Sequence, residues 1–171
     1  TNDGSVAAPT ASLHFTPQLL QQLNEDGISS EFLTLHVGAG TFKPVKSETL
    51  EGHSMHAEWM EISLPLLERL YEIYSSGRPV FCVGTTSLRS LESIYWMGVK
   101  CYLHPAISES ELPLQQWDAH QLPQELNIQE AISYLIEWMR NRQLNRLVIQ
   151  TSILITPAYK CRSISGLLTN F

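Results

Sequence analysis

Short apolar segments with strand-like composition alternate along the chain with longer segments in which apolar residues recur at helical spacing. This alternation limits the fold more than any other feature of the sequence, because strands that alternate with helices form layered α/β domains. The strand-like segments are residues 31–37, 57–63, 79–83, 100–103 and 147–155, and the helical segments follow Pro17, Pro65 and Gly84 and span about 127–142. We therefore predict a single α/β domain over residues 1–171, with a largely parallel sheet flanked by helices.

Prolines and glycines mark the expected ends of the helices. Thr16 before Pro17 is typical of a helix start, and Gly27, Gly77 and Gly98 are expected to end the first three helices. A polar, proline-marked connection follows at about 105–123. The region of about 105–142 is the best candidate for an inserted excursion.

Composition indicates the class of protein. The 171 residues and 43% hydrophobic content suffice for one core without disulfides. The three cysteines form no CxxC pair, so neither a disulfide framework nor a thiolate metal site is indicated, and a cytoplasmic location is expected. No apolar run has the length of a membrane span, and no signal-peptide pattern begins the sequence. Because the first residue is Thr1 rather than Met, we expect a piece of a longer protein.

The charges are unevenly distributed. The formal net charge is -6, yet the segment from Trp138 to Phe171 contains no acidic residue and five basic ones, namely Arg140, Arg142, Arg146, Lys160 and Arg162. Such an end suits a phosphate backbone. Acidic partners from elsewhere in the fold explain it equally well.

Two glycine-containing segments follow strand-like residues. In VGTTSLR (83–89), a helix N-terminus with Thr85, Thr86 and Arg89 suits an anion such as a carboxylate or phosphate, although the hydroxyl residues also suit simple helix capping. In GAGTF (38–42), paired glycines let the backbone approach a ligand or make a tight turn. His36, just before that turn, is open to a structural or a chemical role.

Two further segments carry histidines. EGHSMHAE (51–58) contains His53, His56 and Glu58, which suit either a metal pair with a third ligand or, more simply, proton transfer. The segment is not HExxH, because the glutamate lies after the second histidine rather than next to the first. The small residues of 4–15, with His14 as the titratable group, suit a leader or a backbone-lined pocket wall.

Five segments stand in a fixed order along the chain: GSVAAPTASLHFT, LTLHVGAGTFKPV, HSMHAEW, VGTTSLRSLES and SGLLTNF. Each is weak alone, but together they resemble the S-adenosylmethionine:tRNA ribosyltransferase-isomerase (QueA) family of queuosine biosynthesis. Members of that family transfer the ribosyl part of S-adenosylmethionine onto 7-aminomethyl-7-deazaguanine at the wobble position of tRNA. Epoxyqueuosine forms, and adenine and methionine leave.

The resemblance implies S-adenosylmethionine and tRNA as substrates and no metal or redox cofactor. From the lack of a long apolar run we expect no membrane partner. The resemblance also implies a small β-barrel domain that precedes GSVAAPT and is absent from this chain. The chain then corresponds to the C-terminal part of the family's large α/β domain.

The resemblance further implies a set of site residues. Acid–base candidates are His14, His36, His53 and His56. Expected substrate contacts are Pro9, Thr10, Gly38, Gly40, Thr41, Phe42, Glu58, Thr85, Thr86, Arg89, Tyr159, Thr169 and Asn170.

The sequence departs from the family pattern in three places. Ala158 stands where the family has glycine, Ser165 where it has an acidic residue, and the stretch between VGTTSLRSLES and ITPAY is longer by a few dozen residues. An enzyme is the leading hypothesis. A paralogue that binds S-adenosylmethionine or tRNA without turnover is the alternative, and a metal-dependent hydrolase that uses His53, His56 and Glu58 is a distant third.

Overall fold

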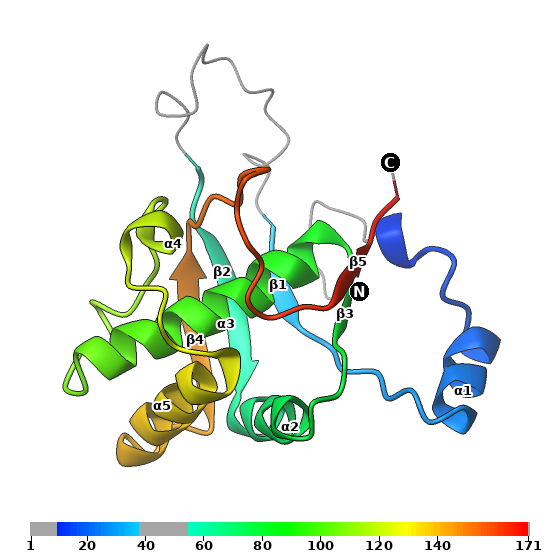
Figure 1. The fold of residues 1–171 in the computed structure, drawn as a ribbon, viewed down its shortest axis with the longest axis horizontal. Coiled ribbons are helices and arrows are strands. Elements are labelled where there is room, and N and C mark those ends of the chain that lie inside the picture. Colours follow the sequence, from blue (N-terminus) through cyan, green and yellow to red (C-terminus); the bar gives the residue numbers. More distant parts are fainter. Residues whose placement is uncertain (1–9, 38–54, 171) are drawn as a thin grey trace, which may run out of the picture.

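A computed structural model of the chain describes residues 10–37 and 55–170 (Figure 1). Its helical elements are η1 (Thr10–Ser12), α1 (Pro17–Glu25), α2 (Leu64–Ser75), α3 (Thr85–Leu103), α4 (Asp118–Gln121) and α5 (Ile128–Asn141). Its strands are β1 (Thr34–His36), β2 (Glu58–Ser63), β3 (Phe81–Val83), β4 (Arg146–Thr151) and β5 (Gly166–Leu168). The expectation of an α/β fold is confirmed.

Strands β1, β2 and β4 form a three-stranded sheet in that order, and both pairings are antiparallel. Successive side chains point to opposite faces of a strand. Met60 and Ile62 of β2 are fully buried on one face, whereas Trp59 and Val148 are each 49% exposed on the other. Among the described residues, the sheet therefore packs its inner face into the core and exposes side chains on its outer face.

Helix α3 crosses the sheet, and α5 lies beside α3 (Figure 1). The buried side chains of α5 include Ile132, Leu135 and Met139, which join Ile94 and Met97 of α3 in one apolar core. The core thus places α3 directly over the inner face of β2 and β4.

Among the strands in the described residues, β3 and β5 are the only pair that runs parallel. The expectation of a largely parallel sheet is therefore wrong for the three-stranded sheet. The alternation of strands and helices fixes direction only when a single crossover joins two neighbouring strands. Here β2 and β4 are neighbours but lie far apart in the sequence, with three longer helices between them.

The prediction that the third helix ends at Gly98 is also wrong, as is the strand predicted at 100–103. Helix α3 continues through Gly98 to Leu103. A Cβ at Gly98 would lie 2.0 Å from the carbonyl oxygen of Ala131 in α5. The glycine therefore allows two helices to approach closely and does not terminate one of them.

The other predicted elements are confirmed, with shorter strands. Thr16 caps α1 through a bond from the Leu19 N–H to its hydroxyl oxygen (3.2 Å), and Gly27 follows that helix with φ of +83°. The helix predicted at 127–142 is α5, capped by Asn127. The strands predicted at 31–37, 57–63, 79–83 and 147–155 are shortened to β1, β2, β3 and β4. That 105–142 is an insertion stays a prediction.

Candidate active site

The N-terminus of α3 brings together three segments that are far apart in the sequence. Gly84 adopts φ of +90°, a left-handed conformation that a side chain disfavours. Its N–H donates to the Leu168 carbonyl of β5 (2.8 Å), and a Cβ placed on it would lie 3.5 Å from the Cβ of Ala11 in η1. The η1 segment, the turn after β3 and strand β5 therefore meet at one point.

Arg89 links α3 to the sheet on the next turn of the helix. Its Nη1 donates to the Glu58 carboxylate at 2.5 Å, with 12% of the arginine side chain and 3% of the glutamate side chain exposed. Its Nη2 donates to the Thr151 carbonyl (3.1 Å) and to the His56 carbonyl at a longer 3.4 Å. The guanidinium thus holds the start of β2 and the end of β4 beside α3.

The electrostatics of this pair follow from its burial. Burial lowers the pKa of Arg89, and the Glu58 carboxylate opposes that effect. The Nε atoms of Arg89 and Arg162 are buried and, within the part of the chain that the structure describes, have no hydrogen-bond acceptor.

A second buried carboxylate, Glu92, holds the C-terminal segment against α3. It is fully buried and accepts four hydrogen bonds. Its Oε1 accepts from the Arg162 N–H (2.9 Å), the Ser163 N–H (2.9 Å) and the Ser163 hydroxyl (2.5 Å). Its Oε2 accepts from the Tyr159 hydroxyl at 2.5 Å. Glu92 therefore fixes the segment that leads into β5.

Tyr159 is fixed by two bonds at its hydroxyl. Besides donating to Glu92, this oxygen accepts from the Trp96 indole Nε1 at 2.8 Å. Burial and the adjacent Glu92 carboxylate raise the pKa of Tyr159 well above its usual range. Tyr159 therefore remains a neutral phenol, and its ring rather than its hydroxyl is the part available to a ligand.

The remaining predicted residues lie at different distances from this cluster. Thr85 and Thr86 are exposed on the first turn of α3, where Gly84 brings no side chain to cap the helix. Thr169 and Asn170 directly follow β5. The residues around Glu92 and the N-terminus of α3 therefore lie in one region, joined by the segment that leads from Tyr159 through β5. Pro9, Gly38, Gly40, Thr41, Phe42 and His53 lie outside the described residues.

The three described histidines of the predicted acid–base set differ in position. The His56 carbonyl contacts Arg89 directly. His36 pairs with Trp59 across β1 and β2, and its exposed side chain shares the outer face of the sheet, away from Arg89. His14 is exposed in the turn after η1, next to the segment that packs on Gly84. His56 therefore lies nearest to the buried ion pair.

Comparison with known proteins gives a match along the whole chain. A family model described as "Queuosine biosynthesis protein" matches residues 1–171. The chain belongs to this family. An S-adenosylmethionine:tRNA ribosyltransferase-isomerase of Phenylobacterium zucineum is 40% identical over 169 residues, which are 99% of this chain and 35% of that protein. A protein of the same name from Novosphingobium aromaticivorans is also 40% identical, over 99% of this chain and 37% of its own length.

Another relative matches about half of the chain at higher identity. A ribosyltransferase-isomerase of Caulobacter vibrioides is 56% identical over 91 residues, or 53% of this chain and 25% of that protein. The chain spans about a third of the length of the queuosine-family relatives it matches. The expected resemblance is thereby confirmed.

Sequence reasoning on this family member missed Glu92, Ser93 and Thr151. The hydroxyls of Ser93 and Thr151 lie 2.7 Å apart and are buried between α3 and β4. A signal for Glu92 is present in the sequence, because this carboxylate lies one helical turn after Leu88 on the apolar side of α3. A charged residue among buried helical positions is rarely left without a specific partner.

The basic C-terminal segment finds much of its charge balance within the fold. Arg140 pairs with Glu68 (2.7 Å) and Arg146 with Glu61 (2.5 Å). Arg142 lies 4.2 Å from the Trp138 ring centre and donates to a backbone carbonyl. For these three residues the structure favours intramolecular partners over a phosphate backbone.

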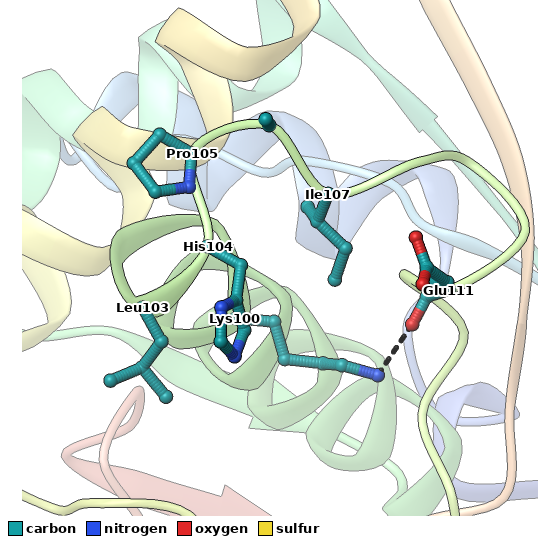
Figure 2. A pocket seen from close by; sticks show the side chains of 7 residues that line it. Lys100, Leu103, His104, Pro105, Ile107 and Glu111 are labelled. Atoms are coloured by element: carbon teal, nitrogen blue, oxygen red, sulfur yellow. Dashed lines mark hydrogen bonds between the residues drawn. The ribbon is translucent and has the colours of Figure 1, made fainter.

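A separate hollow of about 560 Å³ lies at the C-terminal end of α3 (Figure 2). Lys100 extends along it and donates to the backbone carbonyls of Glu111 (2.7 Å) and Pro113 (2.9 Å). Lys100 is eleven positions beyond Arg89, or about 16 Å along the helix axis. The hollow is therefore not part of the candidate active site, and Lys100 anchors the loop that lines it.

Two negative findings concern the described residues only. Within 10–37 and 55–170, no three His, Cys, Asp or Glu side chains are grouped closely enough to hold a metal ion. Because His53 lies outside these ranges, a pairing of His53 with His56 is not tested. No helix in the same ranges is long and apolar enough to cross a membrane.

Proposed function

We propose that the protein transfers and isomerises the ribosyl moiety of S-adenosylmethionine onto 7-aminomethyl-7-deazaguanine at the wobble position of tRNA. Epoxyqueuosine would form, and adenine and methionine would be released. Family membership over residues 1–171 carries this proposal, because it includes every segment on which the site is built. The names of the relatives supply the two substrates.

The geometry around Gly84 and Arg89 supports the proposal. The N-terminus of α3 offers backbone N–H donors, with the hydroxyls of Thr85 and Thr86 beside them. We assign this end of the helix to an anionic group of the substrates, such as the methionine carboxylate or a tRNA phosphate. Arg89 is already bound to Glu58, so its role in this proposal is to hold the wall of the site.

For proton transfer we favour His56 among the described histidines, because its backbone is held within reach of the Arg89–Glu58 pair. A neutral imidazole near pH 7 suits both deprotonation next to the sulfonium and protonation of the leaving adenine. His14, His36 and His53 remain in the proposed acid–base set. Pro9, Thr10, Gly38, Gly40, Thr41 and Phe42 remain proposed substrate contacts, together with Tyr159, Thr169 and Asn170.

The sulfonium of S-adenosylmethionine is itself the electrophile, so the proposed reaction needs no additional metal or redox cofactor. We place the reaction in the cytoplasm, where tRNA and S-adenosylmethionine are both present. The relatives are about three times as long as the segment they share with this chain. We propose that the additional length includes the family's β-barrel domain and that turnover requires it.

A chimera tests this function directly. The segment of the Phenylobacterium zucineum relative that matches this chain is replaced by residues 1–171, and the purified chimera is given S-adenosylmethionine and tRNA that carries the 7-aminomethyl base. We expect adenine release and the corresponding mass increase on the tRNA. The unaltered relative serves as the positive control, and the isolated chain is expected to be inactive.

The outcome also separates the enzyme from a binding paralogue. A folded chimera that binds S-adenosylmethionine but releases no adenine would contradict the enzyme hypothesis and favour the paralogue. A cooperative thermal transition close to that of the relative establishes that the chimera is folded. Elemental analysis of the purified chain tests the hypothesis of a metal-dependent hydrolase. The absence of stoichiometric zinc would argue against it.

A further inference from the structure

Three aromatic rings form a continuous row beside the candidate active site. The ring centres of Trp117 and His120 lie 5.6 Å apart, and those of His120 and Tyr159 lie 5.9 Å apart. His120 is exposed, whereas Trp117 and Tyr159 are half-buried. We call Trp117, His120 and Tyr159 the aromatic row. Only Tyr159 belongs to the predicted site, and the other two lie in the region expected to be an insertion.

Two rings of the aromatic row, Tyr159 at one end and His120 in the middle, are each anchored to a different segment. Tyr159 is held to α3 by its hydroxyl bond to Glu92. His120 is held by a contact of 3.0 Å between its Nε2 and the Leu154 carbonyl. Rings that are fixed in this way lose little conformational freedom when a ligand stacks on them, so more of the contact energy is retained.

The aromatic row also adjoins the residues of the ion pair. The side chain of Gln116, next to Trp117, accepts from the Met55 N–H at 2.9 Å, and Met55 directly precedes His56. The Gln116 carbonyl accepts from the Leu154 N–H at 3.0 Å, just beyond the end of β4. The segment that carries Trp117 is therefore a wall of the same region, although it is distant in sequence from the other site segments.

Two basic residues, Lys160 and Arg162, follow Tyr159 closely in the chain. Lys160 is exposed directly after Tyr159, and the Arg162 N–H binds the same carboxylate that holds the Tyr159 hydroxyl. The acidic side chain closest to Trp117 in the sequence is Asp118, which lies 3.7 Å from the Lys100 ammonium. Aromatic faces next to basic side chains are the combination with which proteins bind unpaired RNA bases.

We propose that the aromatic row is a stacking surface for an unpaired base of tRNA, and that Trp117 and His120 are binding residues for it. An anticodon loop supplies such bases, and Lys160 supplies charge for the adjoining phosphate. The surface extends the proposed function, on which the choice of tRNA as the nucleic acid rests. The contacts among the three rings do not depend on which reaction the protein catalyses.

Binding of the chain to an RNA hairpin tests the proposal. The probe is a fluorescent hairpin of an anticodon stem and loop, and its anisotropy gives the Kd. We expect Trp117→Ala to weaken binding about tenfold and His120→Ala about fivefold, since loss of one stacked ring costs about that much. Trp117→Phe keeps an aromatic face and is expected to bind within about threefold of the wild type.

Trp59→Ala is the matched control, because Trp59 is a tryptophan that is 49% exposed on the outer face of the sheet and is not one of the three rings of the row. We expect less than a twofold effect. Equal effects of Trp59→Ala and Trp117→Ala, no effect of Trp117→Ala and His120→Ala, or no binding by the wild-type chain would overturn the proposal. His120→Ala alters an exposed side chain, so it reports on the row even if Trp117→Ala fails to fold.

A second arm measures binding of S-adenosylmethionine by the same variants. Its affinity is expected to stay within about twofold in Trp117→Ala. If Trp117→Ala weakened binding of S-adenosylmethionine and left hairpin binding unchanged, the proposal would be overturned. The aromatic row would then bind the adenine of S-adenosylmethionine and not tRNA. An inactive chimera with intact, Trp117-dependent hairpin binding would refute the proposed reaction and leave the stacking surface supported.

Discussion

Replacing Glu92 is the perturbation whose effect follows most closely from the structure. Glu92 is fully buried on α3, and its carboxylate accepts four hydrogen bonds from Tyr159, Arg162 and Ser163. These bonds hold the segment that leads to β5. We therefore expect Glu92 variants to release the C-terminal segment from α3.

The magnitude depends on how many donors lose their acceptor. In Glu92→Ala all four donors lose their acceptor. At a low value of about 1 kcal/mol for each unpaired donor, the free energy of unfolding falls by about 4 kcal/mol. In Glu92→Gln the amide oxygen can replace Oε1, which accepts three of the bonds. Only the Tyr159 hydroxyl then loses its acceptor, so at the same value for each donor the expected decrease is about 1 kcal/mol.

Urea denaturation followed by circular dichroism measures both differences. Glu137→Gln is the control, because Glu137 is an exposed helical glutamate of α5, and its effect is expected to stay within about 0.5 kcal/mol. Equal, control-like values for all three variants would refute the role of Glu92 as the anchor. A larger loss for the glutamine than for the alanine variant would refute the count of unpaired donors.

Three further predictions concern the packing and charges of the same region. Gly98→Ala is expected to lower the free energy of unfolding by at least about 2 kcal/mol, because the added Cβ would lie 2.0 Å from a backbone oxygen of α5. An unchanged melting temperature would contradict the close contact between the two helices. Arg89→Leu is expected to lower the free energy of unfolding by about 3–5 kcal/mol, because it leaves Glu58 without its ion-pair partner. The double variant that also carries Glu58→Leu should recover part of this loss. Fully additive effects of the two substitutions would argue against the ion pair. Burial raises the pKa of the Cys82 and Cys101 thiols from 9.0 to about 12. The folded protein therefore keeps these thiols protonated, and the stability this contributes is fully present below pH 9 and is lost as the pH rises toward 12. The free energy of unfolding from urea denaturation between pH 8 and 11 should therefore fall less steeply with pH in Cys82→Ala than in the wild type, by up to about 1.4 kcal/mol per pH unit. Identical slopes would show that the Cys82 thiol does not contribute.

Local signals in the sequence predicted most of the helices. Thr16 and Asn127 start helices because their side-chain oxygens accept from backbone N–H groups a turn later, which is a contact within a few residues. Gly98 misled the prediction because its reason is not local. The glycine is required by the backbone of α5, more than thirty residues further along the chain.

The direction of the strands could not be predicted from alternation alone. The β2 strand pairs with β4 across a long stretch of sequence, and no periodicity within either strand records whether the partner runs parallel or antiparallel. The parallel pair β3 and β5 depends on Gly84 and Leu168, whose backbone bond joins segments 84 residues apart.

The candidate site was predicted in part. The order of the motifs placed Glu58, Arg89 and Tyr159 in it, and the structure joins the first two in an ion pair. The sequence could not show that Arg89 faces a carboxylate, because Glu58 lies on another element. Glu92 and Trp117 were missed for the same reason, since their partners are distant in sequence.

Turnover by the chimera tests the central claim most directly. Residues 1–171 replace the matching segment of the Phenylobacterium zucineum relative, and release of adenine from S-adenosylmethionine is followed in the presence of tRNA with the 7-aminomethyl base. We predict adenine release that depends on this tRNA, together with the mass increase expected for epoxyqueuosine. A folded chimera that binds both substrates and releases no adenine would contradict the claim.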